Sequence, residues 1–180
     1  FVCGKPRAAG ALSTFGAGFK ASAGLVVPYL VLASRPRVRG ALAGAVGAGL
    51  AVLVLGLVGF GTHALDALGL LSSNQGRSSR LSLPYVVADV VGNRSAVRAL
   101  FGLAFAAVAA WTLWRTWRGA DPIRMAGWAT LAILLASAWL VPWYLLWLLP
   151  LAALAADRRL AVATVALSGW VLAIGVPGIY

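Results

Sequence analysis

The sequence predicts an all-α polytopic membrane protein, a bundle of about four to five transmembrane helices with a short re-entrant hairpin at the N-terminus. Of its 180 residues, 62% are hydrophobic and 11% are charged, whereas soluble domains are about 45–50% apolar and about 25% charged. The mean hydropathy is +0.92, so the apolar residues exceed what one small core can bury. Lys and Arg number 15 against four acidic residues. Because these cations lie between apolar runs, they indicate topology rather than nucleic-acid binding.

Four apolar segments account for the predicted spans. Residues 41–60 carry no charge and, as a helix, are about 30 Å long, the thickness of the hydrocarbon core. Residues 96–114 form a second span, with interfacial tryptophans at one end. Residues 125–156 also lack charge but are too long for one crossing, so we expect a hairpin that turns near Pro142. Residues 160–176 supply the last span.

The N-terminal segment, residues 8–34, allows two interpretations because Lys20 lies in its middle. If the basic residues on both flanks are cytoplasmic, the segment forms two short helices that turn near residues 18–20. A single straight span is the alternative. The hairpin places ten cations on the cytoplasmic side: Lys5, Arg7, Arg35, Arg37, Arg39, Arg115, Arg118, Arg124, Arg158 and Arg159. Four cations remain outside: Arg77, Arg80, Arg94 and Arg98.

This orientation makes residues 62–95 an extracytoplasmic loop within a single transmembrane domain, residues 1–180. We expect a short interfacial helix at residues 63–71 and an irregular loop at residues 74–82, after which Pro84 begins the return to the membrane. The loop holds Asn74, Gln75, Arg77 and Arg80. Guanidinium groups bind phosphate, and amides both donate to and accept from sugar hydroxyls. The loop is therefore a candidate phosphate and sugar site, and the alternative is a solvated loop whose arginines meet lipid headgroups.

Three further residues are candidates for chemistry. Lys20 is a charge within apolar sequence, which predicts an anionic partner unless the side chain snorkels to water. His63 and Asp66 are three residues apart, so on a helix the carboxylate can orient the imidazole for proton transfer. Alternatively, both are simply solvated at the start of an interfacial helix.

The remaining polar residues favour structural roles. Asp121 and Asp157 adjoin arginines, which indicates turns or ion pairs. Gly40 and Gly44 are spaced for helix packing. One cysteine and one histidine cannot complete a structural zinc site, so we expect no metal and no cofactor.

Three segments resemble a known family: residues 16–28 (GAGFKASAGLVVP), residues 74–84 (NQGRSSRLSLP) and residues 141–150 (VPWYLLWLLP). They are similar to the C-terminal half of actinobacterial integral-membrane mannosyltransferases of the GT-C superfamily. The resemblance implies a protein of a bacterial cytoplasmic membrane that transfers mannose from a polyprenyl-phosphate donor to a lipid-linked glycan or glycolipid on the outer face.

By this resemblance, Lys20, Arg77 and Arg80 hold the donor phosphate, Asn74 and Gln75 meet sugar hydroxyls, and His63 assists proton transfer. The catalytic aspartate of the family lies in its first outer loop, and residues 1–40 contain no acidic residue. We therefore expect the chain to be the C-terminal part of a longer protein and incomplete as a catalyst on its own. The expected partners are membrane lipid, the donor, the acceptor and the N-terminal portion. The rival interpretations are a transporter or flippase-like module that uses Lys20, and a non-catalytic membrane subunit.

Overall fold

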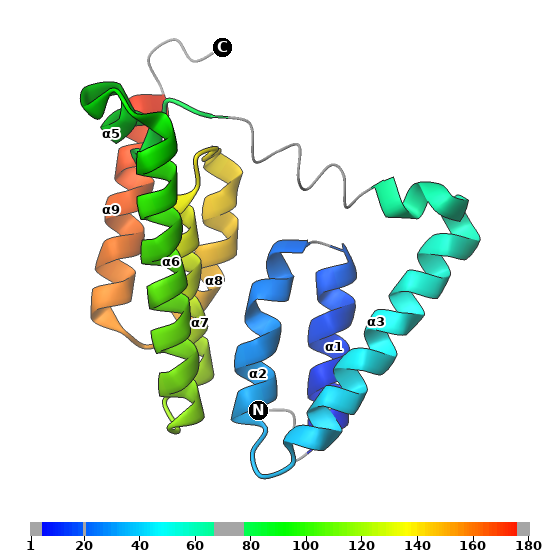
Figure 1. Ribbon diagram of the computed structural model, residues 1–180. Helices are drawn as coiled ribbons and strands as arrows, with labels where there is room; N and C mark the ends of the chain where they lie inside the picture. Colours follow the sequence, from blue (N-terminus) through cyan, green and yellow to red (C-terminus); the bar gives the residue numbers. More distant parts are fainter. Residues whose placement is uncertain (1–4, 20, 67–77, 176–180) are drawn as a thin grey trace.

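The computed structural model describes residues 5–19, 21–66 and 78–175, and these residues form helices with no strand among them (Figure 1). The first half comprises α1 (Pro6–Phe19), the 3-10 helix η2 (Ala21–Val26), α2 (Val27–Ala33), α3 (Val38–Phe60) and the 3-10 helix η3 (Gly61–Leu65). The second half comprises α5 (Leu83–Val91), α6 (Arg94–Trp117), α7 (Pro122–Ala136), the 3-10 helix η4 (Pro142–Tyr144), α8 (Leu145–Leu154) and α9 (Arg158–Gly175). The all-α prediction is confirmed.

The N-terminal segment is a hairpin, as the charge pattern favoured. Helix α1 runs in one direction, and η2 with α2 returns beside it (Figure 1). The 14 residues of α1 give a length of about 21 Å, less than the hydrocarbon thickness of about 30 Å. The chain then turns at residues 34–37, where the N–H of Arg37 donates to the carbonyl of Ser34 at 2.8 Å. Both ends of the hairpin therefore lie at the same end of the bundle.

Small residues let α1 and α3 approach each other at backbone distance. A Cβ atom added to Gly44 would overlap the carbonyl oxygen of Arg7, and one added to Gly10 would overlap that of Ala41. Ala41 is fully buried. Close approach through small residues is typical of membrane helix pairs, so the packing role predicted for Gly44 is confirmed.

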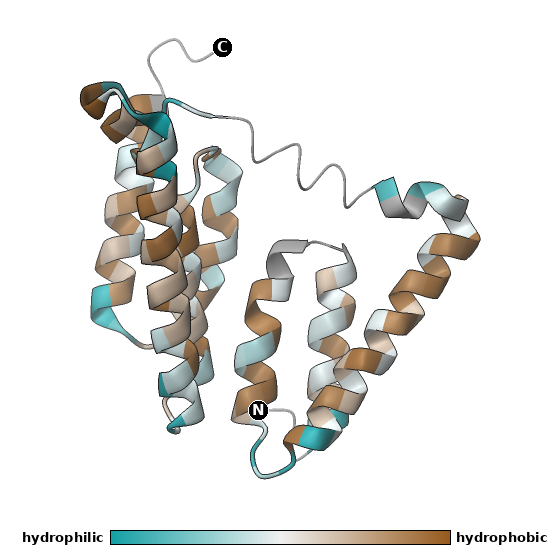
Figure 2. Ribbon diagram, in the orientation of Figure 1, coloured by the Kyte–Doolittle hydropathy of each residue, from teal (hydrophilic) through white to brown (hydrophobic). Residues whose placement is uncertain are grey.

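Helices α3 and α6 present apolar surface outward. The two candidate membrane spans are Val38–His63, formed by α3 and the start of η3, and Arg94–Trp117, formed by α6. Only 6% and 11% of an 18-residue apolar window of each span is buried within the protein. Val58 is 81% exposed and Leu103 is 70% exposed, and Figure 2 shows hydrophobic residues along both helices. Exposing apolar surfaces of this size to water is unfavourable in free energy, so they indicate contact with lipid. The helices predicted at residues 41–60 and 96–114 are confirmed, and each lies within one of the two candidate spans.

The structure does not confirm the predicted count of four to five spans. Helix α7 has 15 residues and α8 has 10, and both are shorter than the about 20 residues that a perpendicular crossing needs. The helical break near Pro142 is confirmed: α7 ends at Ala136, and η4 starts the returning segment at Pro142. Leu134, Leu148 and Leu160 from α7, α8 and α9 are almost completely buried and share one apolar core.

Two aspartates join the helices of the second half. Asp121 caps α7 by accepting from the N–H groups of Ile123 and Arg124. Asp157 caps α9, and its other carboxylate oxygen accepts from Arg124 Nε at 2.7 Å and from Trp128 Nε1 at 3.1 Å. The turn role predicted for Asp121 and the ion-pair role predicted for Asp157 are confirmed.

Helix α2 attaches the N-terminal hairpin to the second half. Tyr29 is 1% exposed and packs against Met125, Ala126 and Ala129 of α7. Its phenol oxygen lies 2.8 Å from Thr112 Oγ1 of α6. The hydroxyl of Thr112 lies 2.8 Å from the carbonyl of Val108 in its own helix. If the Thr112 hydroxyl donates its single proton to the Val108 carbonyl, its oxygen accepts a hydrogen bond from the Tyr29 hydroxyl.

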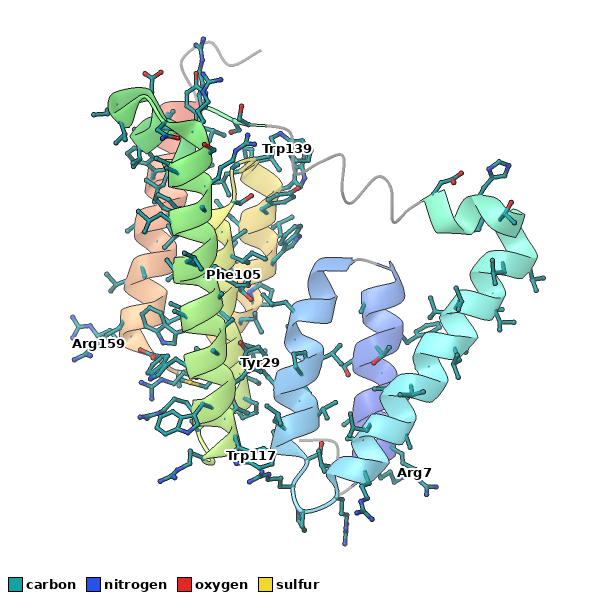
Figure 3. All side chains as sticks on the ribbon, in the orientation of Figure 1. Arg7, Tyr29, Phe105, Trp117, Trp139 and Arg159 are labelled. Atoms are coloured by element: carbon teal, nitrogen blue, oxygen red, sulfur yellow. The ribbon has the colours of Figure 1, made fainter. Side chains whose placement is uncertain are left out.

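The directions of the helices sort the cations between the two ends of the bundle. The ten cations predicted to be cytoplasmic lie in first or last helical turns, or in connections, towards one end (Figure 1). Arg158 and Arg159, in the first turn of α9, lie further from that end than the others, as the position of Arg159 in Figure 3 shows. Arg80, Arg94 and Arg98 lie at the opposite end. We call the end towards which these cations lie the basic end, and the other the opposite end.

Candidate functional site

A short segment, residues 78–82, is fastened to the opposite end of the bundle. The N–H of Ser79 donates to the carbonyl of Ala138 at 3.0 Å, and its hydroxyl donates to the carbonyl of Leu140 at 2.7 Å. Trp170 Nε1 of α9 donates to the carbonyl of Leu81 at 3.0 Å. Residues 137–141 are not helical, so their carbonyls lack donors within a helix. The backbone N–H and the hydroxyl of Ser79 act as donors to two of these carbonyls.

This attachment places Arg80 beside the break between α7 and α8. Leu81 and Ser82 on one side of Arg80 are buried, whereas Arg80 itself is exposed. Ser82 also caps α5, because its side-chain oxygen accepts from the N–H of Tyr85 at 3.2 Å. The backbone around Arg80 is therefore fixed while its guanidinium faces outward.

Two arginines of α6 lie next to this segment. Arg94 and Arg98 border a small hollow, of about 10 Å³, together with Ser78 and Tyr85. The guanidinium of Arg94 lies 5.9 Å from the ring centroid of Tyr85. The hollow has the volume of one water molecule, so these cations form an exposed surface rather than the wall of a ligand cavity.

Aromatic rings cluster on the break itself. Tyr144 stacks on Trp147 with ring centroids 4.1 Å apart, and it meets Trp139 edge to face at 6.1 Å. Figure 3 shows Trp139 at the end of the bundle away from Trp117 and Arg7. Ring faces of this kind pack against sugars or lipid chains. In this article the outer cluster is Arg80, Arg94, Arg98, Trp139, Tyr144 and Trp147.

His63 and Asp66 form the predicted pair but lie apart from the outer cluster. His63 Nδ1 is 3.1 Å from Asp66 Oδ2, and the two side chains are 86% and 71% exposed. Helix α3 diverges from α1 towards its C-terminal end, so η3 stands away from α5 and α6 (Figure 1). Both side chains are thus exposed, and their catalytic role stays a prediction.

The other predicted ligands are not covered by the structure. Lys20, Asn74, Gln75 and Arg77 lie outside the described residues. Arg80 is the one predicted phosphate ligand that is described, and the structure adds Arg94 and Arg98, which the sequence analysis counted only as outer charges. Their spacing of four residues at the start of a helix was the available signal. Within residues 5–19, 21–66 and 78–175, no group of three or more His, Cys, Asp or Glu side chains is arranged to hold a metal ion.

Comparison with known proteins gives one family. The MptB C-terminal domain family matches residues 89–178, which is half of the chain. The matched region holds α6 to α9, and with them Arg94, Arg98 and the aromatic break. No curated protein and no solved structure matches the chain.

Proposed function

Because the chain belongs to the MptB C-terminal domain family and is a mannosyltransferase-related membrane protein, we propose that it is the C-terminal part of a GT-C glycosyltransferase. In this proposal mannose passes from a polyprenyl-phosphate donor to a lipid-linked glycan or a glycolipid on the outer face of a bacterial cytoplasmic membrane. The outer cluster is the donor site. The aspartate that activates the acceptor is supplied by the portion of the protein before this chain.

The observation that carries the proposal is the outer cluster. Three guanidinium groups and three aromatic rings from distant parts of the chain lie at the same end of the bundle, opposite the basic end. Guanidinium groups at this end run against the usual charge preference of outer loops, and a phosphate partner accounts for them. In sugar transfer the phosphate leaves with increasing negative charge, which fixed cations stabilise.

The acceptor side of the reaction is less complete. An inverting transfer needs a base near the acceptor hydroxyl. His63 and Asp66 are solvated and stand apart from Arg94 and Arg98, so they serve as a base only if the donor reaches across to η3. This geometry favours the missing upstream aspartate over His63.

Mannosyl transfer from a synthetic polyprenyl-phosphate mannose tests the proposal in membranes that contain the full-length protein. We expect Arg94→Ala, Arg98→Ala and the double variant Arg77→Ala with Arg80→Ala each to lower transfer by about 10²-fold or more. Arg118→Ala is the matched control, because this exposed arginine lies at the other end of α6. If Arg94→Ala and the double variant Arg77→Ala with Arg80→Ala both transfer mannose at the normal rate and with an unchanged KM for the donor, the donor-site assignment is wrong.

One feature favours the transporter or flippase alternative. The α1–α2 hairpin is too short to cross the hydrocarbon, and its helices meet around position 20. Broken or re-entrant helices bind anions in transporters. If this alternative holds, Lys20→Ala abolishes lipid or anion movement in vesicles, whereas the Arg94→Ala variant keeps it.

A further inference from the structure

A hollow of about 660 Å³ opens at the basic end between α1 and α2, far from the outer cluster. Its walls include the apolar side chains of Leu12 and Leu30, and its rim carries Lys5, Arg35 and Arg37. A second hollow, of about 620 Å³, shares Lys5 and Arg37 with the first and adds Arg7. Among the residues that the structure describes, no carboxylate lines either hollow. The combined surface is apolar within and positively charged at the rim.

The nearest acidic residue along the segments that line the hollow contributes no carboxylate to it. Asp121 precedes Pro122, which lines the hollow, but its carboxylate accepts from the N–H groups of Ile123 and Arg124 at the start of α7. Arg35 is held at the rim, since it lies over the ring of Trp117 and donates to the Trp117 carbonyl at 3.3 Å. This bond uses one of the five donors of the guanidinium, so Arg35 retains donors for an anion.

The interior of the hollow is suited to hydrocarbon. Leu12 is 66% exposed, although it faces a space between two helices. The hydroxyls of Ser13 and Ser34 donate to the carbonyls of Gly10 and Leu30, so these polar groups already have partners within their own helices. What the wall leaves to a ligand is apolar contact.

We propose that this hollow binds one anionic phospholipid from the leaflet at the basic end. The phosphodiester lies among Lys5, Arg35 and Arg37, and an acyl chain runs along Leu12 and Leu30. Charge complementarity selects the headgroup, and the amphipathic order of the wall matches the order of a lipid in the leaflet. Basic pockets between membrane helices bind anionic headgroups in this way. The site is distinct from the donor site, which lies at the opposite end.

Native mass spectrometry of the full-length protein, released from nanodiscs of phosphatidylcholine with or without phosphatidylglycerol, tests the proposal. We expect one retained phosphatidylglycerol. The double variant Lys5→Ala with Arg37→Ala should weaken its binding about 25-fold, at about fivefold for each cation removed. Arg159→Ala is the matched control, since this exposed cation of the basic end lies on α9 away from the hollow (Figure 3), and it should bind as the unchanged protein does.

A second variant separates a lipid from a free phosphate and does not depend on removing charge. Ala33 lines the hollow and is exposed, so Ala33→Trp should fill the acyl space and displace phosphatidylglycerol while leaving the cations in place. Inorganic phosphate should not compete with the lipid. The proposal is overturned if phosphatidylcholine is retained as well as phosphatidylglycerol, or if Arg159→Ala weakens phosphatidylglycerol binding as much as the double variant does. It is also overturned if inorganic phosphate competes with the lipid and the Ala33→Trp variant binds phosphatidylglycerol normally.

Discussion

Asp157 shows how one side chain joins two helices of the second half, α7 and α9. Its carboxylate caps α9 and bonds to Arg124 and Trp128 of α7, and its side chain is only 8% exposed. Burial by itself raises the pKa of this carboxyl, but the hydrogen bonds from Trp128 Nε1 and the backbone of Leu160 and Arg159, with the charge of Arg124, lower the pKa below its ordinary value of 3.8.

This lowered pKa predicts a pH dependence of stability. A carboxyl whose folded-state pKa is depressed stabilises the fold fully above its unfolded pKa, and that contribution is lost as pH falls through the folded pKa. We expect the unfolding temperature in detergent to fall as pH decreases below about 4, and Asp157→Asn to flatten this decline and to lower stability by about 1–2 kcal/mol at pH 7. Asp89→Asn, at an exposed position of α5, is the control. An identical acid profile in both variants would contradict the assignment.

Contacts between residues close in sequence were predictable, and those between distant residues were not. The His63–Asp66 pair and the cap of α9 by Asp157 follow from spacings of three residues. The bond from Trp128 to Asp157 joins residues 29 positions apart, and Tyr29 meets Thr112 across 83 positions. No periodicity along the chain encodes such meetings, because they depend on how complete helices pack.

Among the elements, α5 was the one that sequence reasoning missed. Its signals were present: Ser82 caps it, Pro84 lies in its first turn, and Gly92 ends it with φ of 75°, a conformation that favours glycine. Pro84 on its own indicated only the point where the chain returns to the membrane. Pro142, in contrast, predicted the α7–α8 break correctly, but the attachment of residues 78–82 to that break depends on Ser79, 61 positions from Leu140.

The contact between α1 and α3 makes a prediction about glycines within one helix. Gly44→Ala places a Cβ against the carbonyl of Arg7, whereas the same change at Gly47 meets no atom within 4 Å. We expect Gly44→Ala to lower the free energy of unfolding by about 1–3 kcal/mol. Gly47→Ala should be neutral or stabilising by up to about 1 kcal/mol, because alanine has the higher helix propensity. Denaturation in detergent, followed by circular dichroism, measures both, and equal effects would rule out close packing at Gly44.

At the scale of the whole molecule, α2 holds the N-terminal hairpin against the region matched by the family, residues 89–178. The bond between Tyr29 and Thr112 is a buried polar contact of this junction, and the bond from Arg35 to the Trp117 carbonyl is an exposed one. A double-mutant cycle with Tyr29→Phe and Thr112→Val should give a coupling free energy of about 0.6 kcal/mol, and at most about 1.7, as for other hydrogen bonds between membrane helices. Strictly additive effects would show that the bond between Tyr29 and Thr112 does not stabilise the junction.

The arrangement of the bundle also predicts which positions are labelled together. Because the N-terminal hairpin returns to the basic end, α3 leaves from that end and α6 returns to it. Thr62 and Ser95 must then lie on one side of the membrane and Arg118 on the other.

A cysteine-labelling experiment tests this arrangement. Cys3 is the only native cysteine, so Cys3→Ser provides a background for Thr62→Cys, Ser95→Cys and Arg118→Cys. In intact cells we expect an impermeant maleimide to label the first two, and Arg118→Cys to be labelled only after permeabilisation, since ten cations favour the cytoplasmic side. If Arg118→Cys alone is labelled in intact cells, the outer cluster faces the cytoplasm and the proposed donor site is wrong. If only one of Thr62→Cys and Ser95→Cys is labelled, the helix arrangement itself is wrong.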